Sequence, residues 1–310
     1  MGGQIKTQEY AYFKREIVPV EEANINIKTH AFQYGTGCFC GIRGYWNDEK
    51  QQFYLYRLKD HYERLYQSAK ILMMNVGHSI EELIDITVSL VKKNQWKEHA
   101  YFRPILYKSD LSISPRLHDV GDDFAIYTIP LGDYLDVEKG LSCRVSSWTR
   151  LAENMIPTRA KASGGYINSA LAKSEAMLDG YDEAIFLDSH GYVSEGSAEN
   201  IFLVRNGKLI TPQFSDSILE GITRRSVIHL AKKELGIEVE ERSIGRSELY
   251  VSDEAFFCGT GVQLSWIREI DRRVIGDGKL GKIAGAIQKL YFDVVMGNQA
   301  GYEDWLTPVY

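Results

Sequence analysis

Lys161 stands among small residues, in the run Ala160-Lys161-Ala162-Ser163-Gly164-Gly165-Tyr166. Small neighbours leave room for a bulky ligand beside the amine. A lysine amine forms a Schiff base with a carbonyl compound once partial burial lowers its pKa. Most lysines are solvated surface residues, so this run indicates a Schiff-base lysine only in combination with other functional groups.

Three further stretches have residue types that suit a charged, phosphorylated ligand. Glu195-Gly196-Ser197 follows a turn, and its carboxylate could pair with a cationic ring nitrogen. Gly221 precedes a predicted helix at Ile222-Thr223, where free N–H groups and the helix dipole favour a phosphate. Gly259-Thr260-Gly261 is a second loop whose backbone suits a phosphate. A solvated acid, a plain helix cap and an ordinary glycine turn are the respective alternatives.

The elements that must position these groups are predicted from hydrophobic periodicity. Before residue 130, apolar and β-branched runs predict strands at 10–17, 41–46, 53–56, 100–107 and 124–129. Helical spacing predicts a helix over 60–76 that ends at Gly77, and the capping box Ser79-Ile80-Glu81-Glu82 opens a second helix. The connection over 108–123 is too long for a tight turn.

Pro130-Leu131-Gly132-Asp133-Tyr134 interrupts this pattern and is the predicted linker. Beyond it, strands are predicted at 141–148, 184–187, 201–204, 209–211, 238–243 and 255–258, with helices at 166–178, 222–235 and 282–295. Asn206-Gly207 predicts a hairpin turn. The sequence therefore predicts a mixed α and β protein with a small domain over 1–129, a linker over 130–138 and a larger domain over 139–310.

Composition excludes several classes of protein. The 310 residues carry a net charge of −6, which offers no general attraction to nucleic acid. No apolar run approaches the ~20 residues of a membrane span, and the N-terminus lacks a signal peptide. The four cysteines show no disulfide or zinc spacing, so we expect no metal site and a cytoplasmic location.

Taken together, the motifs resemble the signature of the class IV pyridoxal-phosphate aminotransferases. The resemblance is strongest in Glu195-x-Ser197-x-x-Asn200-Ile201-Phe202, Leu209-x-Thr211 and Leu219-x-Gly221-Ile222-x-Arg224. Other segments are similar to the branched-chain amino acid aminotransferases: His30-Ala31-Phe32-Gln33-Tyr34-Gly35, Gly41-Ile42-Arg43, His61-x-x-Arg64-Leu65, Tyr101-x-Arg103-Pro104, Ala160-Lys161-Ala162 and Gly259-Thr260.

The resemblance implies an architecture and a cofactor. The fold would be the two-domain α/β fold type IV of D-amino acid aminotransferase, with a small N-terminal α/β domain and a larger, barrel-like C-terminal domain. Lys161 would hold pyridoxal 5′-phosphate and move the substrate proton, Glu195 would bind the ring nitrogen, and Tyr166 would bind the ring oxygen. The phosphate would be held by Arg64, Ile222, Thr223 and Thr260.

The resemblance also implies a reaction. Branched-chain L-amino acids (leucine, isoleucine and valine) would give their amino group to 2-oxoglutarate, forming 2-oxo acids and L-glutamate. The small-molecule donor and acceptor would share one pocket, and Arg103 would swing in for glutamate. A homodimer or higher homo-oligomer is expected, with the 108–123 loop reaching the partner's site. The residues expected to line the pocket are Tyr34, Phe39, Tyr101, Arg103, Tyr134, Thr260 and Gly261.

Several residues depart from the branched-chain pattern. Cys40 stands where relatives typically have glutamate and Gly261 where alanine is usual. Gln263, Trp266 and Leu131 also differ from some relatives. These departures leave open an (R)-selective amine transaminase, alone or beside the branched-chain activity. D-amino acid aminotransferase, aminodeoxychorismate lyase and a non-catalytic binding protein are further alternatives.

Overall fold

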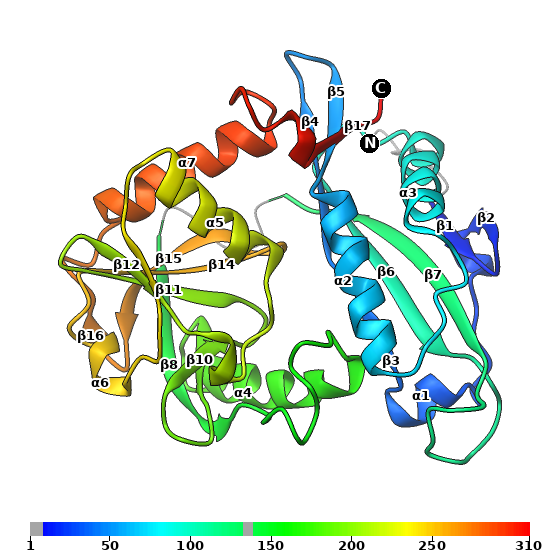
Figure 1. Cartoon of the computed structure of the whole chain (residues 1–310), viewed down its shortest axis with the longest axis horizontal. Helices are drawn as coiled ribbons and strands as arrows, with labels where there is room; N and C mark the ends of the chain where they lie inside the picture. The colour runs from blue at the N-terminus through cyan, green and yellow to red at the C-terminus, as the bar shows by residue number, and fades with distance from the viewer. Residues whose placement is uncertain (1–8, 133–138) are drawn as a thin grey trace, which may run out of the picture. The chain divides into compact units, whose positions relative to one another are not determined.

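The computed structural model describes residues 9–132 and 139–310 and divides into two compact units (Figure 1). The first unit runs to Gly132 and also includes Gly301–Tyr310, and the second covers Asp133–Ala300. The sequence assigned residues 301–310 to the C-terminal domain, and there the structure differs. The reason is that β17 (Leu306–Pro308) pairs with β5 (Gln52–Tyr56) of the first unit.

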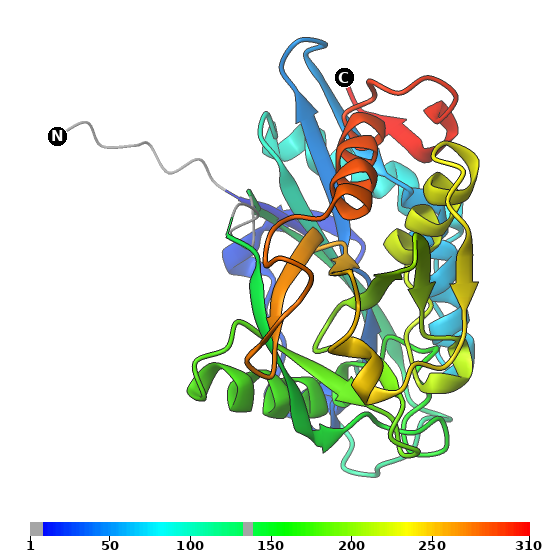
Figure 2. The ribbon, with the colours of Figure 1, turned by 90° about the vertical axis from the view of Figure 1, so that its left-hand side faces the viewer.

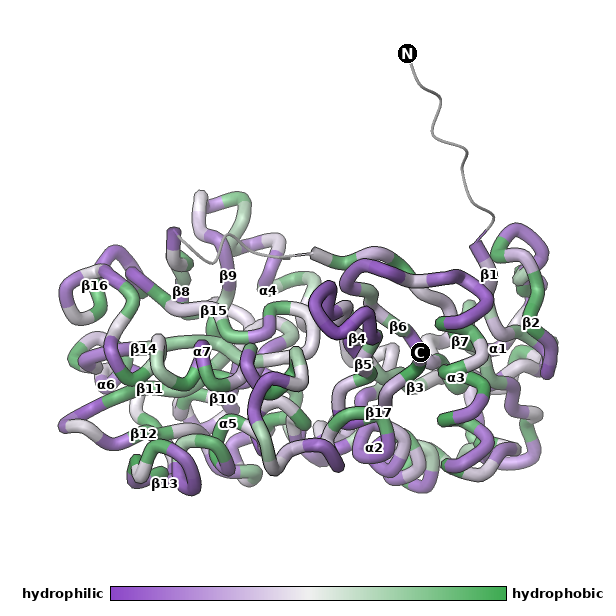
Figure 3. The backbone as a smooth tube through the Cα atoms, turned by 90° about the horizontal axis from the view of Figure 1, so that it is seen from above, coloured by the Kyte–Doolittle hydropathy of each residue, from purple (hydrophilic) through white to green (hydrophobic). Residues whose placement is uncertain are grey.

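An antiparallel sheet forms the centre of the first unit, in the order β17-β5-β4-β6-β7-β1-β2, with β3 on β6. A strongly hydrophilic turn joins β4 to β5 (Figure 3). The other strands of this sheet are β1 (Tyr10–Phe13), β2 (Glu16–Pro19), β3 (Gly37–Phe39), β4 (Ile42–Asn47), β6 (Ala100–Lys108) and β7 (Asp122–Pro130).

Helices α2 (Leu58–Ile71) and α3 (Ile80–Asn94) share the apolar core of this unit with alternate strand residues. The predicted capping box is confirmed: Glu82 N donates to Ser79 Oγ at 3.1 Å, and Ser79 N donates to Glu82 Oε2 at 2.6 Å. The predicted end of the first helix near Gly77 is wrong. Met73 adopts a left-handed φ of 52°, and Met74 N donates back to Ala69 O at 2.8 Å, which ends the helix earlier.

The second unit is built on a sheet in the order β10-β9-β8-β15-β14-β11-β12-β13, with β16 on β15. Strands β10 and β11 lie far apart in this order and yet contact each other, so the sheet curls into a half-barrel. This confirms the predicted barrel-like domain. Its strands are β8 (Leu141–Thr149), β9 (Glu183–Leu187), β10 (Val193–Gly196), β11 (Asn200–Arg205), β12 (Lys208–Thr211), β13 (Val239–Glu241), β14 (Glu254–Gly259), β15 (Gln263–Ile270) and β16 (Arg273–Val274).

Three helices cover this sheet. Helix α4 (Tyr166–Leu178) has the predicted bounds and lies beside the sheet (Figure 2). Its Ala172 and Ala176 pack against Ala184 and Phe186 of β9. Helices α5 (Ile222–Lys233) and α7 (Lys282–Val295) contact β14. No helix within the described ranges has the length and apolar character to cross a membrane.

Candidate active site

Lys161 lies in the segment that leads into α4. The short turn η2 (Ser163–Gly165) joins this segment to Tyr166, the first residue of the helix. The turn lets Lys161 Nζ donate a hydrogen bond to Tyr166 Oη at 2.6 Å. Both residues are half-buried. The structure thus brings together the predicted nucleophile and the predicted ring-oxygen ligand.

Glu195 lies on β10 and is only 4% exposed, so the alternative of a solvated turn acid is wrong. Its Oε2 accepts hydrogen bonds from Asn200 Nδ2 and from Leu219 N, both at 3.0 Å. Its Oε1 lies 2.8 Å from Arg150 Nη2. These donors compensate the buried charge and fix the direction of the carboxylate.

The N-terminus of α5 suits an anion. Gly221 is the N-cap, no side chain caps the helix, and no acid lies in its first turn. A Cβ on Gly221 would lie 2.0 Å from Asn200 Oδ1, so a larger residue does not fit there. The buried Ile222 and Thr223 begin a helix whose first N–H groups lie at the positive end of the dipole, which favours an anion.

Thr260 and Gly261 form the half-buried turn between β14 and β15. Asn200 pairs with Cys258 across β11 and β14, which places this turn close to Asn200. A Cβ on Gly261 would meet nothing within 4 Å, so the turn has room for the alanine that is usual in relatives. Asn200 therefore lies among three predicted cofactor positions: Glu195, the start of α5 and the Thr260 turn.

Two more carboxyl groups are buried near Glu195. Glu199 has its pKa raised to about 8, chiefly by burial and then by the negative charge of Glu183. Lys173 Nζ binds Glu183 Oε2 at 2.6 Å. No cluster of three or more His, Cys, Asp or Glu side chains suited to a metal ion occurs in the described ranges.

Three predicted substrate residues of the first unit, Phe39, Tyr101 and Arg103, form a cluster of their own. The Arg103 guanidinium lies 4.4 Å from the Phe39 ring centroid and 5.1 Å from that of Tyr101. Arg103 Nε also donates to Tyr101 Oη at 3.1 Å. A Cβ on Gly41 would lie 2.3 Å from the same hydroxyl, so glycine is required beside it. The cluster combines one cation with two apolar ring faces.

Three other predicted site residues have separate settings. Arg64 is a buried residue of α2, not an exposed helix-surface partner. Tyr34 ends α1 (His30–Tyr34) and donates through its hydroxyl to Ile113 O at 2.5 Å. Tyr134 and most of the predicted linker lie outside the described residues.

Cys40, which stands where relatives typically have glutamate, has its side chain in the apolar core with Cys38 and Ile42. Its Sγ donates to His61 O on α2 at 3.1 Å. Cys40 therefore packs in the apolar core, whereas its neighbour Phe39 lies against the Arg103 guanidinium. Among the other departures, Trp266 packs against Gly140.

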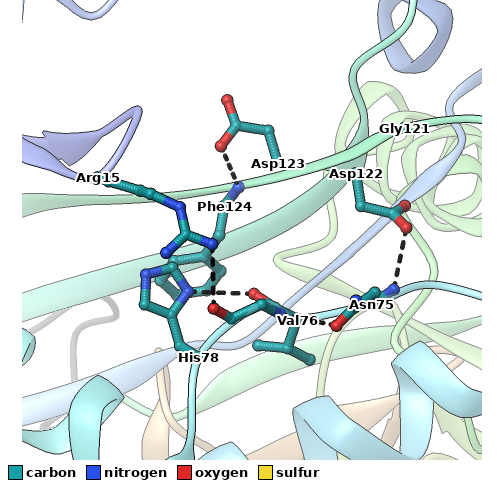
Figure 4. A pocket seen from close by; sticks show the side chains of 9 residues that line it. Arg15, Asn75, Val76, His78, Gly121, Asp122, Asp123 and Phe124 are labelled. Atoms are coloured by element: carbon teal, nitrogen blue, oxygen red, sulfur yellow. Dashed lines mark hydrogen bonds between the residues drawn. The ribbon is translucent and has the colours of Figure 1, made fainter.

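The first unit also has a pocket of about 350 Å³ that holds none of the predicted site residues (Figure 4). Arg15, residues 75–78 and residues 121–124 line it. Two of its charged side chains bind the backbone of the lining: Arg15 Nη2 donates to Gly77 O at 3.2 Å, and Asp122 Oδ2 accepts from Asn75 N at 3.0 Å. Asp123 Oδ2 accepts from Tyr107 Oη at 2.9 Å, and His78 Nε2 is hydrogen-bonded to Tyr12 Oη at 2.8 Å. These four side chains are thus engaged within the first unit.

Residues 38–270 match the family model for amino-transferase class IV. The chain belongs to the class IV aminotransferase family. A probable branched-chain-amino-acid aminotransferase of Aquifex aeolicus is 52% identical over 304 residues, 98% of each chain. The branched-chain aminotransferase structure from Thermoproteus uzoniensis with norvaline has a TM-score of 0.94 and 46% identity, covering 98% of this chain and 100% of its own. The structure of the PLP-form from Thermobaculum terrenum has a TM-score of 0.92 and 40% identity, covering 98% and 99%.

Class IV aminotransferases depend on pyridoxal 5′-phosphate, and the second unit of this aminotransferase fits that group at three points. Lys161 offers an amine to its aldehyde, and Glu195 offers a buried carboxylate to its ring nitrogen. The uncapped start of α5 suits its phosphate. Sequence reasoning missed Arg150, which carries no motif, and it read Asn200 only as part of a signature.

Proposed function

We propose that this aminotransferase moves the amino group of leucine, isoleucine and valine to 2-oxoglutarate, forming 2-oxo acids and L-glutamate. The cluster of Phe39, Tyr101 and Arg103 carries this proposal. A guanidinium binds a carboxylate, and the ring faces beside it suit an aliphatic side chain. An apolar slot separates substrates that differ by one methylene by only ~1–3 kcal/mol, so all three amino acids are accepted.

The roles of the cofactor and of the residues that would hold it follow from the contacts in the second unit. Bound pyridoxal 5′-phosphate supplies the aldehyde that takes up the amino group and a ring that withdraws electrons. Lys161 Nζ would hold the cofactor and would take the proton from the substrate Cα. Tyr166 Oη, which accepts a hydrogen bond from Lys161 Nζ, keeps the amine directed and would bind the ring oxygen. Glu195 would keep the ring nitrogen protonated.

The remaining predicted residues have binding tasks in this proposal. Arg64, Ile222, Thr223 and Thr260 hold the phosphate, with the second unit as the main cofactor domain. Arg103 and Tyr101 bind the substrate carboxylate. The rest of the pocket is lined by Tyr34, Phe39, Tyr134, Thr260 and Gly261.

The same proposal includes a homodimer or higher homo-oligomer and a cytoplasmic location. The 109–121 loop supports the assembly, because Leu111 is 52% exposed and Ile113 is 78% exposed. Such apolar groups suit contact with a second copy of the chain. The cytoplasmic location is supported by four cysteines that are all buried thiols.

Lys161→Ala tests the assignment. We expect leucine-dependent transamination to fall to background and the visible absorption band of the lysine-bound cofactor to disappear. Lys289→Ala removes a lysine whose side chain is 81% exposed and should keep both. Retained transamination in Lys161→Ala would contradict the proposal.

The substrate is tested in the same wild-type protein without an acceptor. L-leucine should bleach the absorption band, whereas (R)-1-phenylethylamine should leave it. Bleaching by the amine alone would identify an amine transaminase. Cys40, one of the departures behind that alternative, lies in the apolar core, which argues against its direct contact with a substrate amine.

A further inference from the structure

Arg150 is a largely buried cation to which the proposed reaction gives no task. It follows β8 directly, and its backbone N donates to Leu187 O at 2.8 Å. Its side chain is 14% exposed, and its Nη2 lies 2.8 Å from Glu195 Oε1. Its guanidinium also lies over the Phe186 ring, 5.5 Å from the centroid. These contacts hold the guanidinium in one orientation.

The surroundings of Glu195 are acidic. Glu183 and Glu199 are both buried, and the negative charge of Glu195 is one of the causes that raise the pKa of Glu199. Lys173 compensates Glu183. A buried carboxylate without a compensating charge is costly and takes up a proton instead. Arg150 supplies the positive charge that contacts Glu195.

The two carboxylate oxygens of Glu195 accept hydrogen bonds from different kinds of donor. Asn200 and Leu219 N bind Oε2, and both are neutral amides. Arg150 binds Oε1 and is the charged partner. Neutral amides orient a carboxylate, but a guanidinium also favours its anionic form.

Arg150 further connects the two halves of the candidate site. Its Nη1 donates to Ser169 Oγ at 3.3 Å. Ser169 is one helical turn beyond Tyr166, which binds Lys161. The guanidinium therefore spans the distance between the strand that carries Glu195 and the helix that begins next to the nucleophile.

We propose that Arg150 is a positioning residue that keeps Glu195 anionic and aimed at the ring nitrogen of the cofactor. The proposal rests on the proposed role of Glu195. Arg150 acts through Glu195 and does not touch the cofactor. Its loss therefore weakens the binding of ligands that have a ring nitrogen and leaves ligands without one unaffected.

The experiment titrates the full-length apoprotein with two ligands. One is pyridoxal 5′-phosphate, and the other is 1-deazapyridoxal 5′-phosphate, in which C–H replaces the ring nitrogen. Binding is followed by visible absorption. The variants are Arg150→Met, Arg150→Lys, Glu195→Gln and the double variant Arg150→Met/Glu195→Gln. Arg144→Met is the matched control, because Arg144 lies on β8 and pairs with Glu175 and Asp179 instead.

We expect Arg150→Met to weaken pyridoxal phosphate binding by about tenfold or more, since breaking a buried pair strands a charge. Its affinity for the deaza analogue should change by less than about threefold, and Arg150→Lys should restore most of the loss, because the charge is kept. In the Glu195→Gln background, adding Arg150→Met should have almost no further effect. Arg144→Met should bind both ligands as wild type does.

Equal losses for both ligands, or an equal loss in the Glu195→Gln background, would overturn the proposal. If Arg150→Met does not fold, Arg150→Lys and the double variant, whose buried site carries no unpaired charge, decide the question. A Glu195→Gln protein that still prefers pyridoxal phosphate as strongly as wild type would instead overturn the role of Glu195, and the role of Arg150 with it.

Discussion

Glu199 is a buried carboxyl whose charge changes close to neutral pH. Burial is the largest cause of its raised pKa, Glu183 and Glu195 add to it, and Ala198 N and Lys173 oppose it. The folded protein holds this proton up to about pH 8, whereas the unfolded chain releases it near the ordinary value of 4.5. Folding stability from this group is therefore present at low pH and is lost as the pH rises through this window.

Glu199→Gln should reduce the dependence of folding stability on pH. The variant keeps a neutral side chain at every pH, so its free energy of unfolding should fall less than that of wild type between about pH 5 and 8. Urea unfolding at several pH values measures this difference. Asp277→Asn, an exposed change, serves as the control and should keep the wild-type slope. A Glu199→Gln protein with the wild-type slope would contradict the assignment.

Gly41 and Gly261 differ in the space around them. A Cβ on Gly41 overlaps the Tyr101 hydroxyl, whereas one on Gly261 meets nothing within 4 Å. Gly41→Ala should therefore displace Tyr101, cost about 1–3 kcal/mol and lower kcat/KM for leucine by about tenfold. Gly261→Ala should leave the melting temperature within the range of a neutral substitution. Thermal melts and steady-state rates check both, and an unchanged kcat/KM in Gly41→Ala would contradict the proposed substrate cluster.

The sequence predicted which residues are candidates for chemistry better than it predicted where their side chains pack. Lys161 and Glu195 could be found because a lone lysine among small residues and an acid within a long signature are distinctive patterns. The direction of Cys40 could not, because the chain between β3 and β4 is irregular and period-2 counting fails there. Arg150 was missed because one arginine at a strand end has no pattern around it.

At the scale of elements, the start of α5 shows how a strand residue shapes a helix terminus. Asn200 Nδ2 donates to both Glu195 Oε2 and Leu219 O at 3.0 Å, and its Oδ1 fills the space beside Gly221. The ring-nitrogen end and the phosphate end of the proposed cofactor site are thus set by one amide. A change at the N-cap should therefore affect the whole site.

Gly221→Ala tests this arrangement. Its Cβ would lie 2.0 Å from Asn200 Oδ1, so we expect a loss of about 1–3 kcal/mol in stability and weaker pyridoxal phosphate binding. Gly245→Ala is the matched control, because Gly245 is also the N-cap of a helix, α6 (Arg246–Leu249), with nothing within 4 Å of its Cβ position. Adding Asn200→Ala should restore part of the stability lost in Gly221→Ala. Equal stability and equal pyridoxal phosphate binding in Gly221→Ala and Gly245→Ala would show that the Asn200 side chain does not restrict the residue at position 221.

Some local signals predicted their elements well, whereas the hairpin over residues 10–19 was missed. The capping box and α4 follow from local sequence, as does the Asn206-Gly207 turn, which has φ values of 52° and 75°. Residues 10–17 were expected to form one strand, but Lys14 and Arg15 turn left-handed and split them into β1 and β2. Lysine and arginine are not among the residues that favour tight turns, so the hydrogen-bonded pairing of β1 with β2 holds the hairpin.

At the scale of the whole molecule, the first unit is assembled from the two ends of the chain. Strand β17 pairs Leu306, Thr307 and Pro308 with Tyr56, Leu55 and Tyr54 of β5. Val309 is buried in the apolar core of this unit, and the Arg57 guanidinium lies 4.4 Å from the Trp305 ring centroid. The last residues are therefore part of the sheet.

Deletion of residues 306–310 should destabilise the first unit by at least about 2 kcal/mol, because it removes strand pairing and the buried Val309. Hydrogen exchange measures the effect by region. The amides of β4 and β5 should lose protection, while those of β11 and β14 in the second unit serve as the internal control. Equal loss of protection in both units would contradict a local role for β17.

The pairing of β17 with β5 also sets an order of events during translation. The second unit is one continuous segment and is made before residues 301–310. Strand β17 therefore leaves the ribosome only after the second unit has been made, and until then the nascent chain carries an open strand edge at β5. Open edges invite wrong pairing with other chains. The first unit is thus begun first but completed only after the second, and its sheet is open to aggregation until β17 pairs with β5.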